Sequence, residues 1–583
     1  MTEKLHSIFK YSQNNLIFKT LLSLIFLASL FSLTKAEVDV KFLTTAVEAN
    51  SEVLFNWDKA NEEDIDAKIV FFDNDIYPTK QKHFIEKSYA FLNLQSEFQK
   101  SHAEKSGKIS IKAPAAEGLY KIYYCAEDKL DGFYCTVGKP ILVLTCPNKK
   151  FNNYLKKTNS KIEHLIIILS ENHSFDSVYG NYCKAPSFSN PKCNFGPECC
   201  EAIPPYLSGV SPVILTDVQN SRWDPCHQSN CETSEINGGK MDKYIINGAG
   251  ASPNNFAAAS GDIFSAQHYH NWAKQYAIAD RFFQSSSGAS CQNDMYFAVG
   301  KFVFKDNDVR PQRAGLNGNK CDPDANFLSY FDPSIGDVLN ACGVSWTWYS
   351  EGYAENPNSG QCYPKFYDAS DNPFAYYPSL TEGVNGNYNF RDYKNLLEDL
   401  ESKSLPAVSY VKFLGMHSEH PGYEGSFLTG QLLSNEVISK IQSSDLYKNN
   451  TLVILVPDES GGFYDHVTPP NASNVDGTLY GPRTQFVTVG EMVKKNYISH
   501  VQMEPASIIR FIEWNFVWKE GALDTRDKVV NNIGDMIDAE IAGEVPSLNP
   551  LFNNKMEIND FRGNYKENKN ISLGNKEQFK FLE

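Results

Sequence analysis

Two short, uninterrupted apolar runs stand out along the chain, at residues 165–169 and 452–456. Apolar residues at every position of a run this short predict a strand that is buried on both faces. Helical patterns lie near them: residues 431–442 place their apolar side chains along one stripe, and residues 506–515 follow a proline. Strands that alternate with helices predict an α/β domain, with a mostly parallel sheet covered by helices on both faces.

A different pattern precedes this region. Short runs separated by turn-rich or charged stretches occupy residues 37–147, and residues 119–125 alternate in the manner of a strand with one buried face. This pattern predicts a small β-sandwich domain of immunoglobulin-like size, followed by a polar linker. The strands are expected at residues 38–43, 52–57, 68–72, 108–111, 119–125 and 133–144.

The first 36 residues predict a secretory signal peptide. Lys4, Lys10 and Lys19 give a basic start, residues 21–33 are apolar and uncharged, and small residues at 34–36 suit cleavage. A membrane anchor is the alternative, but the uninterrupted apolar stretch is shorter than the roughly 20 residues that a bilayer span requires.

Charge narrows the class of protein. The 583 residues carry a net charge of −16, and removal of the first 36, which hold four lysines and one glutamate, brings it to −19. An acidic surface argues against binding nucleic acid or anionic lipid through a basic field. It does not exclude an anionic substrate, because a bound metal ion can dominate the local potential.

The 13 cysteines all lie between Cys125 and Cys362. Disulfides are expected in an oxidising compartment, and the odd number leaves at least one thiol free or paired between chains. Zinc is the rival interpretation, but the cysteine spacings lack two successive C-x2-C pairs. Sequons at Asn449, Asn471 and Asn570 fit a secreted glycoprotein.

Oxygen-bearing side chains follow both apolar runs: Glu171 and Asn172 come after the first, and Asp458 and Glu459 after the second. Ligands of open α/β sheets bind beyond the carboxyl ends of the strands, so these four side chains are expected around one crevice. Carboxylates packed together repel one another unless a cation lies between them, and hard oxygen ligands favour calcium, magnesium, manganese or a similar ion. The pattern alone predicts a cation site of unknown purpose.

Several sequence blocks carry a family resemblance. They are KIEHLIIILSENHSFDSVYG at 161–180, ADRFFQSSSGASCQNDMYFAVG at 279–300, SYVKFLGMHSEHPG at 409–422, TLVILVPDESGGFYDHVTPP at 451–470, and the later YGPRTQFVTVG at 480–490. In this order they resemble the phosphoesterase family that contains bacterial phospholipases C and a type of acid phosphatase. The resemblance extends over about residues 160–540, and several ordered motifs over that length are highly specific.

The resemblance implies an α/β fold related to the alkaline phosphatase superfamily. The family's metal-binding Glu-Asn and Asp-Glu pairs fall on Glu171, Asn172, Asp458 and Glu459, and its hydroxyl nucleophile falls on Ser290. Contact with the metal would lower the pKa of this hydroxyl and supply the alkoxide. One divalent metal ion is therefore expected, and calcium, magnesium, manganese and zinc all remain candidates.

Histidines are the next requirement, because phosphoryl transfer needs donors for the phosphate oxygens and an acid for the leaving group. His420 matches a family histidine of this kind, and His227 lies in an element that resembles a second one. Asp465 and His466 belong to the fourth block and are expected to support the site from behind its ligands.

Two departures from the family concern substrate fit and the leaving group. Cys291 follows the predicted nucleophile, where the family often has a bulkier or apolar residue. Residues 231–236 lack the second histidine that some relatives carry after the position of His227.

The sequence thus predicts a secreted, metal-dependent phosphoester hydrolase with a serine nucleophile. Its substrate is a phosphate ester, either a simple monoester, as for an acid phosphatase, or a phospholipid, as for a phospholipase C. The lipid enzyme should have an apolar lip or loop near its site, which the sequence does not locate. The predicted organisation is a signal peptide at 1–36, a β-sandwich accessory domain at 37–147, a phosphoesterase catalytic domain at 160–545 and a polar tail at 546–583.

Two other classes of protein compete with this prediction. A serine hydrolase of the α/β-hydrolase type is disfavoured, because the chain has no G-x-S-x-G motif. The alternative is a catalytically inactive secreted glycoprotein with a binding or adhesion role. Such a protein should have lost some of the predicted site residues, and all five of the metal and nucleophile positions are present. No nucleic-acid partner is expected, and no transmembrane segment remains after signal removal.

Overall fold

The computed structural model describes residues 39–42, 45–58, 64–73, 91–93, 106–128, 132–135, 139–147, 158–303, 332–353, 364, 366–380, 389–422 and 424–549. The predicted signal peptide and all but the start of the predicted tail lie outside these residues. Among the helices described, none is both long enough and apolar enough to cross a membrane.

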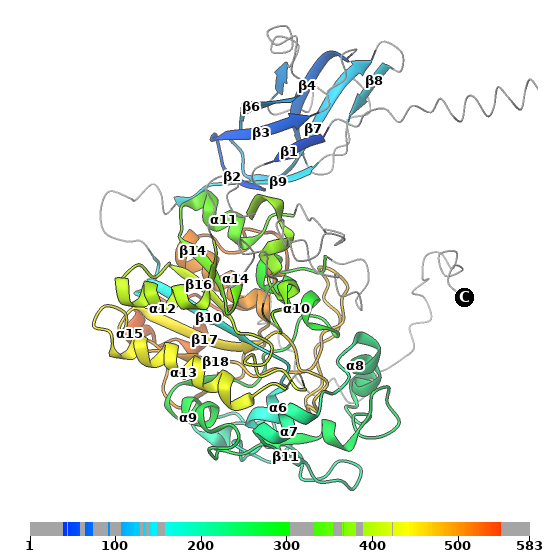
Figure 1. Cartoon of the computed structure of the whole chain (residues 1–583), viewed down its shortest axis with the longest axis vertical. Coiled ribbons are helices and arrows are strands. Elements are labelled where there is room, and N and C mark those ends of the chain that lie inside the picture. Colours follow the sequence, from blue (N-terminus) through cyan, green and yellow to red (C-terminus); the bar gives the residue numbers. More distant parts are fainter. Residues whose placement is uncertain are drawn as a thin grey trace, which may run out of the picture.

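An eight-stranded sheet forms the centre of the larger region (Figure 1). In order across the sheet, the strands are β15 (Phe390–Asp392), β14 (Trp346–Ser350), β16 (Val408–Lys412), β10 (His164–Ser170), β17 (Thr451–Pro457), β18 (Val487–Val489), β13 (Ala277–Ala279) and β19 (Tyr497–Ser499). Neighbours are parallel throughout, except that β18 is antiparallel to both of its neighbours. The mostly parallel sheet predicted from the sequence is therefore confirmed.

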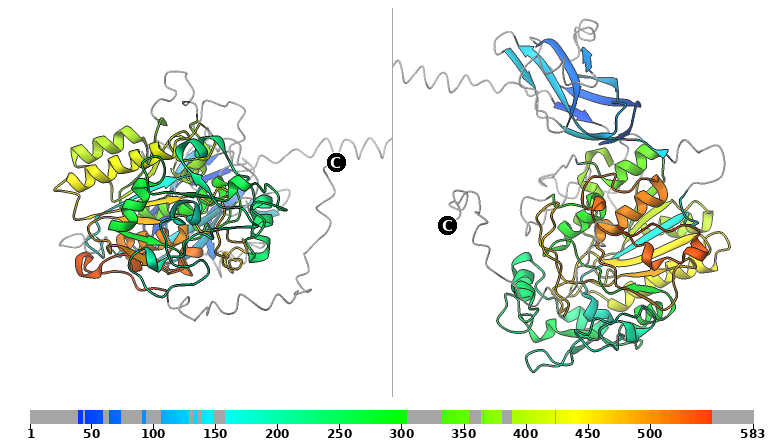
Figure 2. Two further views of the ribbon diagram at one scale, coloured as in Figure 1. Left: turned by 90° about the horizontal axis from the view of Figure 1, so that it is seen from below. Right: turned by 180° about the vertical axis from the view of Figure 1, so that it is seen from behind.

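Helices cover both faces of this sheet (Figures 1 and 2). The side chains of β10 alternate between two cores: Leu165, Ile167 and Leu169 pack on one face, and Ile166 and Ile168 on the other. This double burial explains why the strand is apolar at every position. The first core includes α10 (Ser290–Val299), α11 (Ile335–Cys342) and α14 (Pro505–Ile512), and the second includes α9 (Gln267–Gln275), α12 (Tyr393–Ser402) and α13 (Phe427–Ser443).

Short elements and long loops fill residues 175–266, at the lower end of the molecule in Figure 1. They include α6 (Phe175–Tyr179), α7 (Asp217–Arg222) and α8 (Ser229–Ile236), together with the parallel pair of β11 (Val213–Leu215) and β12 (Ala257–Ala259). A last helix, α15 (Ala539–Ala542), lies near the end of the described chain.

Single turns of 3-10 helix occur both within residues 175–266 and later in the chain. They are η1 (Pro197–Cys199), η2 (Asn237–Gly239), η3 (Pro253–Asn255), η5 (Ala369–Asp371), η6 (Pro373–Tyr376), η7 (Pro378–Leu380), η10 (Arg526–Lys528) and η11 (Gly534–Met536). The π-helical turn η9 (Glu513–Val517) directly follows α14.

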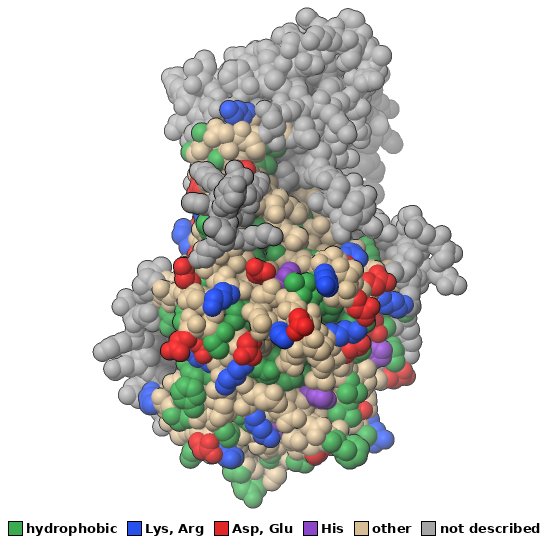
Figure 3. Space-filling view, turned by 90° about the vertical axis from the view of Figure 1, so that its left-hand side faces the viewer, with side chains coloured by type: hydrophobic (Ala, Val, Ile, Leu, Met, Phe, Trp, Pro, Cys, Tyr) green, Lys and Arg blue, Asp and Glu red, His purple; other side chains and the backbone are tan. Residues whose placement is uncertain are grey.

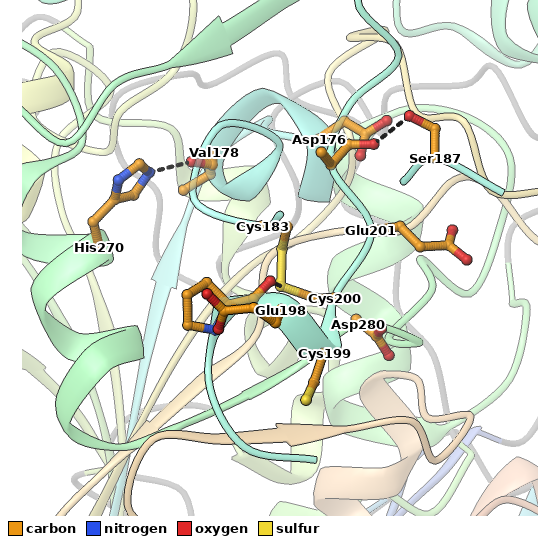
Figure 4. The surroundings of a disulfide bond; sticks show 12 residues. Asp176, Val178, Cys183, Ser187, Glu198, Cys199, Cys200, Glu201, His270 and Asp280 are labelled. Carbon is orange, nitrogen blue, oxygen red and sulfur yellow. Dashed lines mark hydrogen bonds between the residues drawn. A yellow bond between two sulfur atoms is a disulfide. The ribbon is translucent and has the colours of Figure 1, made fainter. Parts of the chain in front are cut away.

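Three disulfides fix the loops of this lower region. They join Cys183 to Cys200, Cys193 to Cys199 and Cys226 to Cys231. Figure 4 shows the first of them beside α6, with Cys199 and Glu201 flanking Cys200 in the chain. The disulfides expected from the sequence are therefore present at these pairs.

The N-terminal strands form two sheets. The first is antiparallel and contains β1 (Asp39–Phe42), β3 (Glu52–Asp58) and β6 (Ser106–Lys112). The second contains β2 (Ala46–Glu48), β9 (Lys139–Leu144), β7 (Gly118–Asp128), β4 (Asp64–Asp73) and β5 (Phe91–Asn93), with β8 (Gly132–Cys135) paired to β7. An immunoglobulin-like packing of the two sheets stays a prediction.

One expected strand, at residues 133–144, is two. Both β8 and β9 pair with β7, but the register shifts by one residue between the pairs Cys125↔Cys135 and Ile122↔Lys139. This change of register accompanies the division of the expected strand.

The N-terminal sheet and the larger region are linked covalently. Cys146, just after β9, forms a disulfide with Cys342 at the end of α11. Leu142 and Leu144 of β9 lie in the same core as Val338 of α11, so the disulfide closes over a shared apolar contact.

Candidate functional site

The two strands that precede the predicted ligands are neighbours in the sheet. β10 and β17 are parallel and in register, with Ser170 opposite Pro457. The residues that follow, Glu171-Asn172 and Asp458-Glu459, therefore leave the sheet at the same edge, and all four side chains are buried. The structure brings these four predicted residues together.

The backbone around Asn172 is tightly constrained. Asn172 has a φ of 61°, a left-handed conformation that asparagine tolerates better than most residues. Gly461, in the loop after Glu459, packs against it so closely that a β-carbon there would lie 2.2 Å from the Asn172 carbonyl oxygen. Only glycine fits at this approach, so the two loops hold one another in place.

Three buried oxygen atoms in the site have no hydrogen-bond partner among the residues described: Oδ1 of Asn172 and both carboxylate oxygens of Asp458. A buried polar atom without a partner is costly, and such atoms call for an ion or another ligand. Amide and carboxylate oxygens are the ligands that hard divalent cations prefer. The donor set therefore fits the expected metal ion.

Ser290 is the first residue of α10 and is almost completely buried. Its Oγ donates a hydrogen bond to Oε1 of Glu459 at 3.4 Å. The loop before it is pinned by Asn293, whose Nδ2 donates to the carbonyl of Gly288 at 2.9 Å and whose Oδ1 accepts from the amide of Ser286 at 2.9 Å. The helix start directs its free N–H groups toward the same region, which suits an anionic group.

His227 contacts the predicted ligands directly. Its Nδ1 lies 2.8 Å from Oε1 of Glu459 and 2.9 Å from the side-chain nitrogen Nδ2 of Asn172. Burial disfavours the charged imidazole, but the Glu459 carboxylate outweighs it and raises the pKa of His227 to about 10. His227 is therefore protonated at neutral pH, and it hydrogen-bonds the same carboxylate as Ser290.

His420 lies opposite His227, with the ring centroids 5.5 Å apart and the planes at 75°. Its Nδ1 is 2.6 Å from the carbonyl oxygen of Pro421, and its Nε2 is 3.7 Å from Oε2 of Glu171. The carbonyl contact fixes Nδ1 as a donor and orients Nε2 toward the ligands. Both predicted histidines are therefore at the site.

Asp224 joins the two histidines at the solvent side. Its side chain is 36% exposed, and its Oδ1 lies 4.0 Å from Nε2 of His227. The potential ligand atoms of Asp224, His227 and His420 all lie within 4.8 Å of one another. Among the described residues, the three carboxylates of Glu171, Asp458 and Glu459 do not form so tight a group.

Lys412 is a site residue that the sequence analysis missed. It is the last residue of β16, opposite Leu169 of β10, and it is buried. Its Nζ lies 3.0 Å from Oε1 of Glu171 and 3.7 Å from Oδ2 of Asp371. Burial opposes the charge of Lys412, but these carboxylates raise its pKa well above the usual value. The feature of the sequence that could have identified it is a single lysine at the end of a mostly apolar strand.

Lys412 also acts on Glu171. Burial tends to raise the pKa of the Glu171 carboxyl, but Lys412 and then His420 outweigh it and lower that pKa to about 2. Glu171 is therefore held as a carboxylate, the form that binds a cation.

Acidic side chains outnumber the cations here. Asp294, one helical turn after Ser290, is fully buried, and neither carboxylate oxygen has a hydrogen-bond partner in the described structure. Burial, together with the charges of Glu171 and Glu459, raises the pKa of Asp458 to about 7 against the opposing charge of Lys412. The excess of buried negative charge favours an additional cation.

Glu232, on α8, was also missed. Its buried carboxylate accepts hydrogen bonds from three segments: Oγ of Ser460 at 3.0 Å, Nε2 of Gln284 at 2.9 Å and the amide of Gly288 at 2.8 Å. It therefore ties the loop after Glu459 to the loop before Ser290. No local sequence pattern indicated this residue, because its partners lie far from α8 in the chain.

Asp465 and His466 belong to a neighbouring network. Nδ1 of His466 lies 2.7 Å from Asp176 and its Nε2 lies 2.7 Å from Glu201. Nε of Arg483 donates to Asp465 at 2.8 Å, and its Nη2 to Asp176 at 3.0 Å. Although Asp176, Asp465 and His466 have the spacing of metal ligands, the guanidinium of Arg483 already supplies the positive charge.

Cys291, the departure next to Ser290, is a buried free thiol. Its Sγ donates to Oγ of Ser370 at 3.2 Å, and burial raises the pKa of the thiol well above the usual value. A neutral, buried thiol packs as a small apolar residue.

Comparisons with known proteins identify the family of this chain. Residues 162–518 match the model of the Phosphoesterase family. The hemolytic phospholipase C of Pseudomonas aeruginosa is 23% identical over 461 residues, covering 68% of this chain and 58% of that protein. The non-hemolytic phospholipase C of Burkholderia pseudomallei is 22% identical over 409 residues, covering 61% and 55%. The non-specific phospholipase C6 of Arabidopsis thaliana is 24% identical over 348 residues, covering 56% and 59%.

The chain thus spans between half and two thirds of the length of these relatives. A solved structure of fibronectin(III)-like modules of CbhA from Clostridium thermocellum aligns with 23% of this chain and 56% of its own, at 14% identity and a TM-score of 0.12, a score too low to define a fold. The family match covers more than half of the 583 residues and includes both strand ends, Ser290 and the two histidines. The chain belongs to the Phosphoesterase family.

Proposed function

We propose that the protein is a metal-dependent phosphoester hydrolase in which Ser290 is the nucleophile. The observation that carries this proposal is the position of Ser290. Ser290 is the first residue of α10, and its buried hydroxyl lies 3.4 Å from Glu459. Asn172 and Asp458, at the same edge of the sheet, have oxygens without hydrogen-bond partners among the described residues. The relatives named phospholipase C are consistent with it.

One divalent metal ion would be held by Glu171, Asn172, Ser290, Asp458 and Glu459. When bound, it would lower the pKa of the Ser290 hydroxyl and offset negative charge on the phosphoryl group. Calcium, magnesium, manganese and zinc all suit a site of this composition.

The chain's own residues would carry the proton and the phosphoryl group. The Oγ of Ser290 would attack phosphorus as its proton passes to Glu459, the acceptor of its hydrogen bond. The bond from phosphorus to the leaving oxygen would break, and a protonated histidine would donate to that oxygen. His227 holds a proton, and its Nε2 is on the solvent side beside Asp224. Water would then release phosphate from Ser290 in a second step, with the proton transfers reversed.

The compartment and the domains are part of the proposal. Disulfides support passage through an oxidising secretory pathway, which agrees with a signal peptide at 1–36. The residues at 160–545 would form the catalytic domain, with a fold related to the alkaline phosphatase superfamily. The β-sandwich at 37–147 would be an accessory domain, and 546–583 a polar tail.

The test is hydrolysis of p-nitrophenyl phosphate and p-nitrophenyl phosphorylcholine by the full chain, with and without a chelator. We expect at least one substrate to be hydrolysed, activity to disappear after chelation, and activity to return when a divalent metal is added. Activity that survives exhaustive chelation and dialysis would refute the metal requirement. Hydrolysis of the second substrate but not the first favours a phosphodiesterase over a monoesterase.

A further inference from the structure

Four large apolar side chains are exposed on two adjacent segments of the lower region. We call them the apolar rim: Ile214 is 51% exposed, Val218 52%, Ile263 58% and Phe264 64%. Ile214 lies on β11 and Val218 on α7, while Ile263 and Phe264 are consecutive at a loop tip between β12 and α9. Single exposed apolar residues need no explanation, but a group from neighbouring segments marks an interaction surface.

Hydrogen bonds hold the two segments of the apolar rim together. The amide of Asp217 donates to the carbonyl of Phe264 at 3.0 Å, and Oγ of Ser265 donates to the carbonyl of Leu215. Hydrophobic side chains reach the lower end of the face drawn in Figure 3, the end at which Figure 1 places β11 and α7.

Hydrogen bonds hold the loop tip in a defined conformation. Oδ1 of Asp262 accepts from the amide of Phe264 at 2.8 Å, and its other oxygen accepts from the hydroxyl of Ser260. The amide of Ser260 in turn donates to Oγ of Ser265 at 2.9 Å. These bonds close a tight turn that keeps Ile263 and Phe264 exposed without requiring apolar contacts to position them.

The apolar rim lies beside the solvent side of the proposed site. Two residues after Val218, Asn220 donates from Nδ2 to the carbonyl of Glu419 at 2.8 Å, and its own carbonyl accepts from the amide of Gly422 at 2.8 Å. The helix α7 is therefore fastened to the loop that carries His420. The exposed Asp224 follows α7 by two residues and lies against the same loop, since a β-carbon on Gly422 would be 3.0 Å from Cβ of Asp224.

The charges next to the apolar rim do not oppose a lipid headgroup layer. Asp217 accepts from Oγ of Ser426 at 3.0 Å and from the amide of Leu428 at 3.0 Å, and Asp262 is occupied within its turn. The exposed Arg222, at the end of α7, adds a positive charge between the apolar rim and Asp224. An apolar tip with a neighbouring cation suits the boundary between headgroups and acyl chains.

We propose that the apolar rim docks the protein on a phospholipid bilayer, with Phe264 and Ile263 inserted among the headgroups. This rests on the proposed function and narrows its substrate class to phospholipid. The phosphoester of a membrane lipid lies at the bilayer surface, so a hydrolase must bring the open side of its site, at Asp224 and His227, to that plane. An exposed apolar tip beside this opening meets that requirement, whereas a small soluble phosphate ester has no use for it.

The test compares the full chain with the variant Ile263→Ser/Phe264→Ser on vesicles of phosphatidylcholine. Co-sedimentation should show at least about tenfold weaker binding, because the variant removes both large apolar side chains that would leave water on docking. Hydrolysis of vesicle lipid should fall with it, and hydrolysis of p-nitrophenyl phosphorylcholine should not change. The matched control is Leu446→Ser. Leu446 is also a large, exposed apolar side chain, but it precedes β17 and so lies at the end of the sheet opposite the proposed site.

A second variant reads insertion directly. Phe264→Trp should keep vesicle binding, and its fluorescence should be quenched by lipids that carry bromine on the acyl chain. Equal vesicle binding by the serine variant and the unaltered chain, or no binding by either, would overturn the proposal. In the latter case, dimerisation lost on the same substitutions would identify a second copy as the occupant. Vesicle binding without hydrolysis of any phosphoester would refute the proposed function and leave the docking surface standing.

Discussion

Lys412 sets the electrostatic balance of the site at the scale of single residues. Its ammonium group lies 3.0 Å from Glu171 and 3.7 Å from Asp371, and all three groups are buried. It keeps Glu171 ionised, yet Asp458 and Asp294 still lack hydrogen-bond partners within the described structure. The ammonium group of Lys412 thus holds the carboxylates together but leaves negative charge uncompensated, and a bound metal ion would neutralise it.

Lys412→Met should destabilise the fold by about 3–5 kcal/mol, because it leaves buried carboxylates without their counter-ion. Lys412→Arg keeps the positive charge and should therefore lose less stability than Lys412→Met. Thermal unfolding measured with and without added calcium or manganese should show a larger metal-induced rise of Tm in the methionine variant. An unchanged Tm in that variant would mean that the ion pair does not matter to the fold.

His466 gives a pH dependence that does not involve the proposed metal ligands. Burial disfavours its charge, but Asp176 and then Glu201 outweigh it and raise the pKa of His466 to about 9. Because this exceeds the unfolded value of about 6.5, the stabilisation is complete below pH 6.5 and is lost as pH rises through 9.

Urea unfolding at pH 6.5 and pH 9.5 should therefore show a loss of stability on raising the pH, to which His466 contributes up to about 3 kcal/mol, so that His466→Gln loses less by up to that amount. His268→Gln is the control, since the pKa of half-buried His268 is lowered rather than raised. The same pH slope in His466→Gln and the unaltered chain would show that His466 is not charged in the fold.

At the scale of elements, the disulfide between Cys226 and Cys231 encloses His227 in a loop with a sequence separation of 5. The loop packs against the residues that follow Glu459, since a β-carbon on Gly462 would lie 2.5 Å from the Cys226 carbonyl oxygen. This disulfide therefore positions a histidine more than it stabilises the whole chain.

Cys226→Ser/Cys231→Ser should lower stability by about 2 kcal/mol on chain-entropy grounds but lower turnover at least about tenfold. Cys183→Ser/Cys200→Ser, with a sequence separation of 17, should cost about 3 kcal/mol and leave turnover nearly unchanged. Turnover and unfolding free energy, measured on both double variants, check this crossed pattern. Equal effects on turnover would show that the smaller loop has no positioning role.

The elements most accurately predicted from sequence are those with one dominant cause. The strands β10 and β17 are recognisable because burial on both faces makes every residue apolar, and their polar ends follow directly. The antiparallel direction of β18 depends on pairing with strands that are distant in the chain, and the split of β8 from β9 depends on their register against β7, neither of which the local pattern records.

The same difference separates the site residues. Ser290, the histidines and the four strand-end residues lie in recognisable motifs, whereas Lys412, Asp371 and Glu232 enter the site through contacts between distant segments. Asp294 could have been predicted as a site residue, because it lies one turn after Ser290 on the same helix.

At the scale of the whole molecule, the secretory hypothesis makes a prediction about glycosylation. Asn449 and Asn471 are exposed, while the sequon at Asn172 is buried in the proposed site, and Asn570 lies outside the described residues. Expression in a secreting eukaryotic host, followed by peptide mass analysis after N-glycosidase treatment, should find glycans at Asn449 and Asn471. A glycan on Asn172 would contradict its position at the centre of the fold.

The central claim is that the phosphoryl group passes through Ser290. The most direct measurement is acid quenching of the metal-loaded full chain during turnover of p-nitrophenyl phosphate or p-nitrophenyl phosphorylcholine, followed by mass analysis of the peptide that contains Ser290. We predict one phosphate, or one phosphorylcholine, on Ser290, and turnover at least about a thousandfold lower in Ser290→Ala with Ser443→Ala unaffected. Full turnover by Ser290→Ala, or an adduct on another residue, would contradict the account.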